Sequence, residues 1–244
     1  WRYHIPRIYY ITHSLGPLMY ITGAFPKRVT AMPIFGPHNE ANSASNLYWR
    51  LPDRSAVVTC LNDDDSVFRV TGWSHFGGHA NTYRVCGELG QIENLRGMGE
   101  KVMLRYNSWS KPEGMEEINL YEPEWNDKDE DLIKQSGHGG GDFVVARMFL
   151  QCIRENRQPE HPFDLYSAVT MSSVAILAWR SVLNGNRPYD IPDFRREEDR
   201  KQYENDYESP FYCSDGREPT IPCCTDPNYK PTEKQLEIFK EVIK

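Results

Sequence analysis

The sequence predicts an α+β domain in which a mostly antiparallel, open β-sheet carries helices on one face. Short β-branched and aromatic runs are closely spaced between residues 27 and 106. Strands so close together cannot be joined by crossover helices, so they are expected to pair antiparallel. Helical periodicity dominates from residue 142 onward. Strands first and helices afterwards are typical of a sheet covered on one side.

Turn residues divide the first half of the chain into short elements. An apolar run over residues 15–22 predicts a helix with Pro17 in its first turn, where proline is tolerated, and Gly23 at its end. The run Asn62–Asp65 separates two β-branched segments and predicts a hairpin. The predicted strands cover residues 27–34, 55–61, 66–73, 81–86, 91–95 and 101–106.

The second half alternates between polar connections and amphipathic helices. Residues 107–136 are acidic and are expected to form an exposed connection with little regular structure. Asp142 is expected to cap a helix that carries an apolar stripe at helical spacing. Asp164 is expected to cap a second helix, which Asn184 and Gly185 end. The stripe of the first helix consists of Val145, Met148, Phe149, Cys152 and Ile153.

The last part of the chain is less regular. Residues 195–208 are dense in charge and predict a solvated helix or strap, and residues 233–243 predict a final amphipathic helix. Between them lies a segment rich in proline and cysteine without periodicity. We therefore expect one substrate-binding and oligomerisation domain over residues 1–210 and a tail over residues 211–244.

Composition excludes several classes of function. A net charge of -7 argues against a general affinity for nucleic acid. The longest apolar stretch, around residues 169–179, is too short and too polar to span a bilayer. Six cysteines without CxxC spacing are expected to be free thiols in a reducing cytoplasm. The chain opens with Trp1 and no signal peptide, so we expect its true N-terminus to lie upstream.

Tyr10 and His13 form the first candidate for chemistry, three residues apart and close to a helix start. Histidine titrates near neutrality and can take the proton of a sugar hydroxyl. A tyrosine hydroxyl can assist as a donor or, with a depressed pKa, as a base. The alternative is a structural histidine hydrogen-bonded to a helix end, with tyrosines packed in the core.

The second candidate is the glycine-rich segment Gly137–Asp142. Glycines at a helix N-terminus expose backbone N–H groups that favour oxygen-rich ligands. His138, at its start, would project towards such a ligand, and Asp142 would lie beside it. The alternative is a tight turn with a capping aspartate.

The third candidate is the aromatic and glycine-rich turn Trp73–His79, in which His75 is placed to bind a sugar ring. Two histidines four residues apart lack a third ligand, so no metal site is expected. Arg84 on the following strand can also reach a ligand. The alternative for the Trp73–His79 turn is packing at a sheet edge. The alternative for Arg84 is an ordinary arginine on an exposed strand face.

A dinucleotide-binding fingerprint is absent from the sequence. Such a site needs a glycine-rich turn between a strand and a helix, with an acidic residue about twenty positions later. The glycines of 137–141 follow a polar loop instead. This chain alone is therefore not expected to bind a dinucleotide.

Taken in order, these motifs resemble the C-terminal domain of the Gfo/Idh/MocA oxidoreductases over residues 1–210. Tyr10–Pro17 is similar to the Tyr-x-Thr-His-x-Leu-Gly-Pro segment of one branch, which includes NAD-dependent glycosidases of the α-N-acetylgalactosaminidase type. Gly87–Glu93 is similar to the family's Gly-x-x-Gly turn between strands, and Gly137–Phe143 resembles its Gly-His-Gly-Gly-x-Asp helix start. Ser181–Phe194 resembles its closing pattern.

The resemblance implies an N-terminal Rossmann domain that binds NAD or NADP and carries a catalytic lysine in a Glu-Lys-Pro motif, neither of which this chain contains. It implies that His13 is the acid/base on the oxidised sugar hydroxyl. Tyr10 matches the tyrosine that assists proton removal in the glycosidase branch. Tyr9 departs from the pattern, because many members have an aspartate there. The family's sheets commonly pair, which implies a homo-oligomer.

Three classes of function remain open at this point. The leading hypothesis is the substrate-binding part of an NAD(P)-dependent oxidoreductase that acts on a sugar or polyol, with no nucleic acid or membrane partner. The second is an NAD-dependent glycosidase or lyase that oxidises its sugar transiently. The third is a non-catalytic sugar-binding or dimerisation module.

Overall fold

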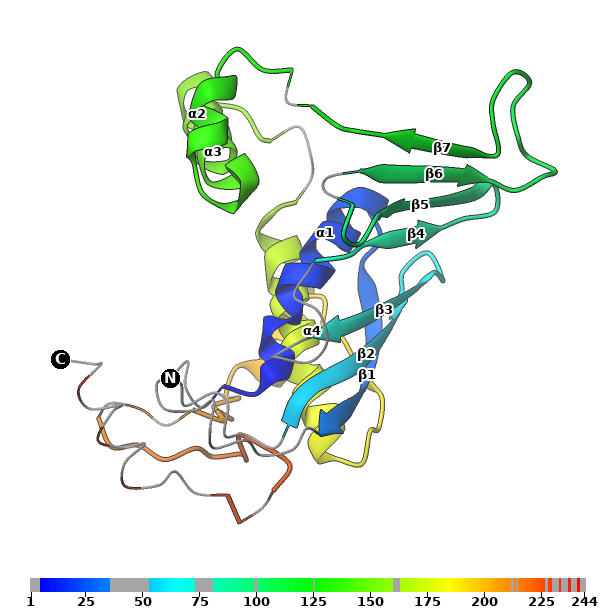
Figure 1. The fold of residues 1–244 in the computed structure, drawn as a ribbon. Coiled ribbons are helices and arrows are strands. Elements are labelled where there is room, and N and C mark those ends of the chain that lie inside the picture. The colour runs from blue at the N-terminus through cyan, green and yellow to red at the C-terminus, as the bar shows by residue number, and fades with distance from the viewer. Residues whose placement is uncertain are drawn as a thin grey trace. The chain divides into compact units, whose positions relative to one another are not determined.

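The computed structural model describes most of the chain in two compact units. The described residues are 5–35, 53–72, 81–98, 101–124, 126–159, 163–211, 213, 215–226, 228, 229, 233, 237 and 241. The first unit combines residues 1–79 with residues 165–244, and the second comprises residues 80–164. Both contain antiparallel strands and helices, which confirms the predicted α+β class (Figure 1). Among the helices described, none is long and apolar enough to cross a lipid bilayer.

The first unit contains a four-stranded antiparallel sheet in the order β3-β2-β1-β8. The hairpin predicted around Asn62–Asp65 is confirmed, because Cys60 of one strand pairs with Phe68 of the next. Alternating residues such as Val29 and Val58 are fully buried, as expected of a sheet with one face in a core. The strands are β1 (Pro26–Phe35), β2 (Asp53–Asn62), β3 (Val67–Gly72) and β8 (Tyr189–Asp190).

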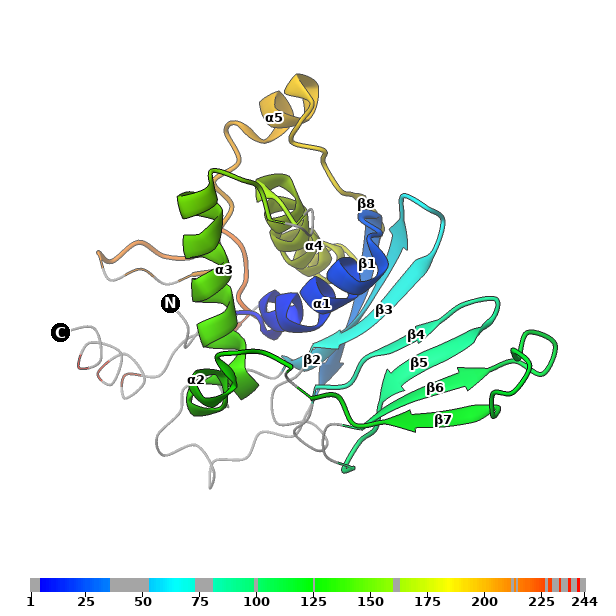
Figure 2. The same cartoon turned by 90° about the horizontal axis from the view of Figure 1, so that it is seen from above.

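Two helices, α1 (Thr12–Thr22) and α4 (Leu165–Leu183), lie on one face of this sheet (Figures 1 and 2). A 3-10 turn, η2 (Arg7–Ile11), precedes α1, so the helix begins three residues before the predicted position. Pro17 is consequently its sixth residue. Gly23 ends α1 in the left-handed conformation (φ 71°) and donates its N–H to the Met19 carbonyl oxygen at 2.9 Å, as predicted.

Helix α4 also completes the hydrogen bonding of the sheet. Strand β8 is only two residues long and pairs with Arg28 and Val29 of β1. Beyond that point the Ala31 N–H donates to the hydroxyl of Ser181, 3.1 Å away and fully buried. A helix side chain thus replaces the missing strand partner of a buried backbone group.

The second unit contains another four-stranded antiparallel sheet, in the order β4-β5-β6-β7. Its strands are β4 (Arg84–Cys86), β5 (Gly90–Asn94), β6 (Val102–Tyr106) and β7 (Ile118–Tyr121). Gly90 is required by close strand pairing, because a Cβ there would lie 2.1 Å from the Arg105 carbonyl oxygen. The prediction that residues 107–136 lack regular structure is wrong in part, since β7 and α2 (Glu130–Gln135) lie within them.

The helices that follow depart from the prediction in two respects. Helix α3 (Gly141–Glu155) is capped by Gly140 in the left-handed conformation, and Asp142 lies inside its first turn without a side-chain capping bond. None of its residues is buried, so the predicted apolar stripe remains largely exposed: Val145, for example, is 68% exposed. In the first unit, α5 (Glu197–Tyr203) confirms the charged helix expected within 195–208. Of the predicted final helix, residues 233, 237 and 241 are described and are helical.

Replacing Ser181 by alanine is expected to destabilise the first unit by about 1–3 kcal/mol, because the buried Ala31 N–H loses its acceptor. Ser172→Ala in the same helix is the matched control: Ser172 is exposed, so its loss should change stability by less than about 0.5 kcal/mol. Denaturant unfolding of the two variants measures the difference. Equal stability would show that the Ser181 hydroxyl is not required by the sheet.

Candidate functional site

Tyr10 and His13 lie at the junction between η2 and α1. Their rings stack almost in parallel, with centroids 5.9 Å apart and an interplanar angle of 11°. Tyr10 is half-buried and His13 is exposed. The pair therefore offers an accessible imidazole next to a phenol whose orientation is restricted.

Apolar packing fixes the backbone beneath this pair. Ile8, Ile11 and Leu15 are buried at helical spacing and direct Tyr10 and His13 towards the remaining face. Helix α1 approaches α4 closely at Gly16. A Cβ on Gly16 would lie 3.0 Å from the sulfur of Met171.

Two neighbours of the pair were not among the predicted site residues. Arg7 is buried, and its guanidinium carbon lies 5.8 Å from the centroid of the Tyr10 ring, within range of a cation–π interaction. Burial raises the pKa of Tyr9 to about 12, and its ring contacts Phe211. Tyr9 therefore stays protonated at neutral pH and cannot replace an aspartate as a base. No periodicity in the sequence marks Arg7.

His138 and Asp142 form the second cluster. His138 Nδ1 lies 2.9 Å from Asp142 Oδ1, and the imidazole is 82% exposed. An ionised carboxylate only accepts hydrogen bonds, so Nδ1 donates and Nε2 of the neutral ring is left as an acceptor. The turn requires glycine at position 140, where φ is 100° and a Cβ would lie 2.4 Å from the Ile133 side chain.

The backbone of this turn is less open to anions than the sequence indicated. The N–H groups of Gly140 and Asp142 donate to the Gly137 carbonyl oxygen, at 3.1 and 3.4 Å. The Gly141 N–H donates to the His138 carbonyl oxygen, and the Phe143 N–H to a serine hydroxyl. The predicted array of exposed N–H groups is therefore mostly used within the turn. The exposed polar side chains of the turn are the His138 imidazole and the Asp142 carboxylate.

The structure gives less support to the other two predicted site residues, Arg84 and His75. Arg84 forms a cross-strand ion pair with Glu93, with Nε 2.5 Å from Oε2, so a ligand would have to compete with that carboxylate. His75 lies outside the described residues. Tyr10 and His13 belong to the first unit, whereas Arg84, His138 and Asp142 belong to the second, and each cluster is described within its own unit.

Neither a metal nor a dinucleotide fits the described residues. No three His, Cys, Asp or Glu side chains in that part of the chain come together in a way that could hold a metal ion. The glycine-rich segment follows helix α2 instead of a strand. Its N–H groups are mostly occupied within the turn, so it does not provide the phosphate cradle of a dinucleotide site.

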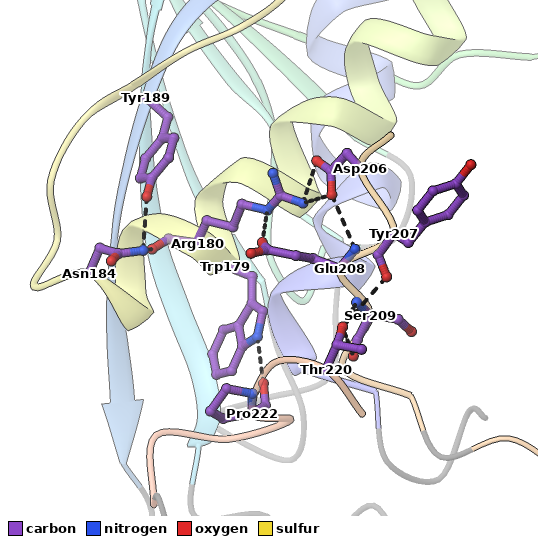
Figure 3. Close-up of polar contacts among 10 residues, drawn as sticks. All are labelled: Trp179, Arg180, Asn184, Tyr189, Asp206, Tyr207, Glu208, Ser209, Thr220 and Pro222. Carbon is purple, nitrogen blue, oxygen red and sulfur yellow. Dashed lines mark hydrogen bonds and ion pairs between the residues drawn. The ribbon is translucent and has the colours of Figure 1, made fainter. Parts of the chain in front are cut away.

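Two residues of α4 attach the C-terminal tail and the segment just before it to the first unit, and neither contact was predicted. Arg180 of α4 binds Asp206 through Nη2 at 2.7 Å and Glu208 through Nε at 3.1 Å (Figure 3). The adjacent Trp179 donates its indole N–H to the Pro222 carbonyl oxygen at 2.9 Å. These bonds join residues 26 to 43 positions apart, so local patterns could not reveal them.

Comparison with known families supports the resemblance found in the sequence. Residues 80–201 match the family described as "Glycosyl hydrolase 109, C-terminal domain". A glycosyl hydrolase family 109 protein of Solibacter usitatus is 34% identical over 96 residues, which cover 37% of this chain and 22% of that protein. An alpha-N-acetylgalactosaminidase of Tannerella forsythia is 38% identical over 63 residues, which cover 26% of this chain and 13% of that protein.

A solved structure shows the same fold. A levoglucosan dehydrogenase in complex with NADH and L-sorbose superposes on 75% of this chain and 49% of its own, with a TM-score of 0.58 at 14% identity. The chain thus spans about half the length of that solved protein, and its aligned part about a fifth of the Solibacter relative. These matches confirm the predicted resemblance to the Gfo/Idh/MocA C-terminal domain and to its glycosidase branch.

Ion pairs that acid should break join α3 to the segment before α2. Arg147 of α3 binds both carboxyl oxygens of Asp127, at 2.7 and 2.5 Å, and also Asp129, at 2.7 Å. Hydrogen bonds from Arg147 and from the Asp129 N–H lower the pKa of Asp127 to about 2. A depressed folded-state pKa stabilises the fold above the unfolded value of 3.8, and this contribution is lost as the pH falls towards 2.

We expect Asp127→Asn to remove this part of the pH dependence of unfolding between pH 4 and 2, and to lower stability at neutral pH. Glu113→Gln, on an exposed side chain, is the control and should leave the acid profile unchanged. Denaturant midpoints measured from pH 2 to 7 provide the comparison. Parallel profiles for wild type and Asp127→Asn would contradict the assignment.

Proposed function

Because the chain belongs to the glycosyl hydrolase 109 family, we propose that it is the substrate-binding part of a nicotinamide-dependent enzyme that acts on a sugar hydroxyl. The observation that carries the proposal is the stacked Tyr10–His13 pair, with its accessible imidazole at the start of α1. A buried histidine packed among apolar side chains would instead have favoured a structural role.

His13 has the main chemical role in this proposal. Its exposed imidazole takes the proton of the sugar hydroxyl that is oxidised and returns it when the hydroxyl is restored. The stacked ring of Tyr10 restricts the orientation of His13, and its own hydroxyl assists proton transfer. Within the second unit, His138, oriented by Asp142, is proposed to bind a sugar hydroxyl through Nε2.

Oxidation of an alcohol needs a hydride acceptor, which the described residues cannot hold. In this proposal a separate domain, which is not among the described residues, binds NAD or NADP. The levoglucosan dehydrogenase with the same fold has NADH and L-sorbose bound. This chain supplies the residues that bind the sugar and move its hydroxyl proton.

A glycosidase is the second candidate, and the match to the glycosyl hydrolase 109 family favours it. Transient oxidation of a ring carbon makes the neighbouring C–H more acidic, so a nearby base can remove that proton before the leaving group departs. Tyr10 is the residue proposed for this step, because it lies beside His13 and is only half-buried.

We also propose that the sheet of the second unit pairs with a second copy of the chain. Val85, Ile92 and Leu104 are register partners on one face, which makes that face apolar, and Ile92 is 43% exposed. The opposite face carries charged residues such as Arg84 and Glu93. An apolar, partly exposed sheet face is suited to burial against another sheet.

The enzymatic proposal predicts unequal roles for two adjacent tyrosines. In the polypeptide that contains both this chain and its dinucleotide-binding domain, His13→Ala should lower turnover by about 10²–10⁴-fold, and Tyr10→Phe by about tenfold or more. Tyr9→Phe is the matched control and should retain most of the activity, because Tyr9 remains protonated. Normal turnover by His13→Ala would refute the catalytic assignment.

The same assay separates the two enzyme classes. With NAD and a panel of free sugars and aryl α-N-acetylgalactosaminides, a dehydrogenase accumulates NADH in proportion to product. A glycosidase releases the aryl group from many substrate molecules without net NADH.

The oligomer proposal predicts a matched pair of variants. Ile92→Lys should dissociate the assembly, because it places a charge on the apolar face. Gln91→Lys, on the opposite face of the same strand, should leave it intact. Sedimentation velocity over a range of concentrations measures both, and a monomeric wild-type chain would refute the proposal.

A further inference from the structure

The tail segment Pro222–Thr225 is attached to the first unit at both ends. On one side, Trp179 of α4 donates its indole N–H to the Pro222 carbonyl oxygen (Figure 3). On the other side, Thr225 donates its backbone N–H and its hydroxyl to the carboxylate of Asp53 on β2, at 2.5 and 2.6 Å. Asp53 is itself buried. Two anchors to the core therefore restrict the backbone between these residues.

Two adjacent thiols, Cys223 and Cys224, lie between the anchors. Both are free and buried, at 5% and 1% exposure, with Tyr229 packed against them. Both also line a single cavity of about 250 Å³. A cavity of this size admits a ligand smaller than a drug molecule. Its other lining residues are Glu218, Pro219, Thr220, Ile221, Pro222, Asp226 and Tyr229.

The two thiols are chemically unequal. The neighbouring thiol of Cys224 lowers the pKa of Cys223, and that of Cys223 raises the pKa of Cys224. The Cys224 thiol itself donates to the Asp226 carbonyl oxygen at 3.6 Å. Cys223 is therefore the stronger nucleophile, since the thiolate is the reactive form. Cys224 is placed to react second.

A direct disulfide does not suit this arrangement. The peptide bond between the cysteines is trans, which places their Cα atoms about 3.8 Å apart. Ordinary disulfides span about 4.4–6.8 Å between Cα atoms. The anchors at Pro222 and Thr225 restrict the backbone change that would relieve the mismatch. One larger atom bridging the two sulfurs avoids it.

The residues around the two thiols disfavour metal ions and anions as the bridging ligand. Zinc prefers four ligands, and the described residues contain no cluster of three or more that could hold a metal ion. The carboxylates of Glu218 and Asp226 in the cavity wall disfavour anionic reagents. A neutral, thiophilic ligand that needs two sulfurs is the class that remains.

We propose that Cys223 and Cys224 form a chelating dithiol site for a trivalent arsenical. In the reaction with a hydrated arsenical, R–As(OH)2, two S–H bonds and two As–O bonds break. Two As–S bonds form and two water molecules leave. Arsenic remains trivalent throughout, so no oxidant or reductant is required.

The test uses the full 244-residue chain and phenylarsine oxide as the probe. We expect one phenylarsenic group per folded chain, mapped by mass spectrometry to a peptide containing Cys223 and Cys224. The adduct should resist an excess of 2-mercaptoethanol and be released by ethanedithiol, because only a dithiol competes with a chelate. Cys223→Ser and Cys224→Ser should each lower retention under 2-mercaptoethanol by about 10²-fold.

Matched controls keep the result interpretable. Cys86→Ser and Cys213→Ser, at an exposed and a half-buried thiol, should retain the adduct like wild type. Emission from the six tryptophans, Trp179 among them, compared with that of wild type, verifies that the serine variants are folded. A wild-type adduct that maps to other cysteines, or equal retention by Cys223→Ser, would overturn the proposal. Tetrahedral Co²⁺–thiolate absorption that depends on both cysteines would also overturn it, in favour of a metal site.

Discussion

The packing of α4 against β1 is the constraint on which the first unit depends. The inner face of α4 is almost fully buried, from Val174 to Val182. Each functional segment of the unit is then attached to this helix. Close approach at Gly16 seats α1, and with it the Tyr10–His13 pair. Trp179 binds the tail at Pro222, and Arg180 binds the segment just before the tail at Asp206. The candidate catalytic pair and the dithiol pair thus share one structural support.

Much of the fold was predictable because its signals are local. The β-branched runs and the Asn62–Asp65 turn specify β2 and β3, and Gly23 supplies the left-handed cap of α1. The prediction failed where local signals are weak. Strand β7 contains only four residues within an acidic segment, so its pattern was too short to stand out. Asp142 resembles a cap, but Gly140 adopts the φ of 100° that the turn requires.

The candidate site follows the same rule. Tyr10 and His13 are three residues apart, and His138 and Asp142 four apart, so a short local segment of the backbone brings each pair together. The Asp53–Thr225 anchor joins residues 172 positions apart, and the Arg180 ion pair spans 26. Such contacts arise only from the packed fold. For that reason the sequence singled out the cysteines of the tail but could not indicate what surrounds them.

Because strand β8 is short, the edge of β1 beyond it must be protected from pairing with other molecules. A strand with unpaired backbone groups at the edge of a sheet is a template for intermolecular pairing and aggregation. After Val29, that edge of β1 faces the end of α4 and the turn after it. The Ala31 N–H donates to the Ser181 hydroxyl, and the Thr30 hydroxyl donates to the Asn186 carbonyl oxygen. An incoming strand would have to displace both. Helix α4 therefore blocks edge-to-edge pairing of this sheet with another molecule.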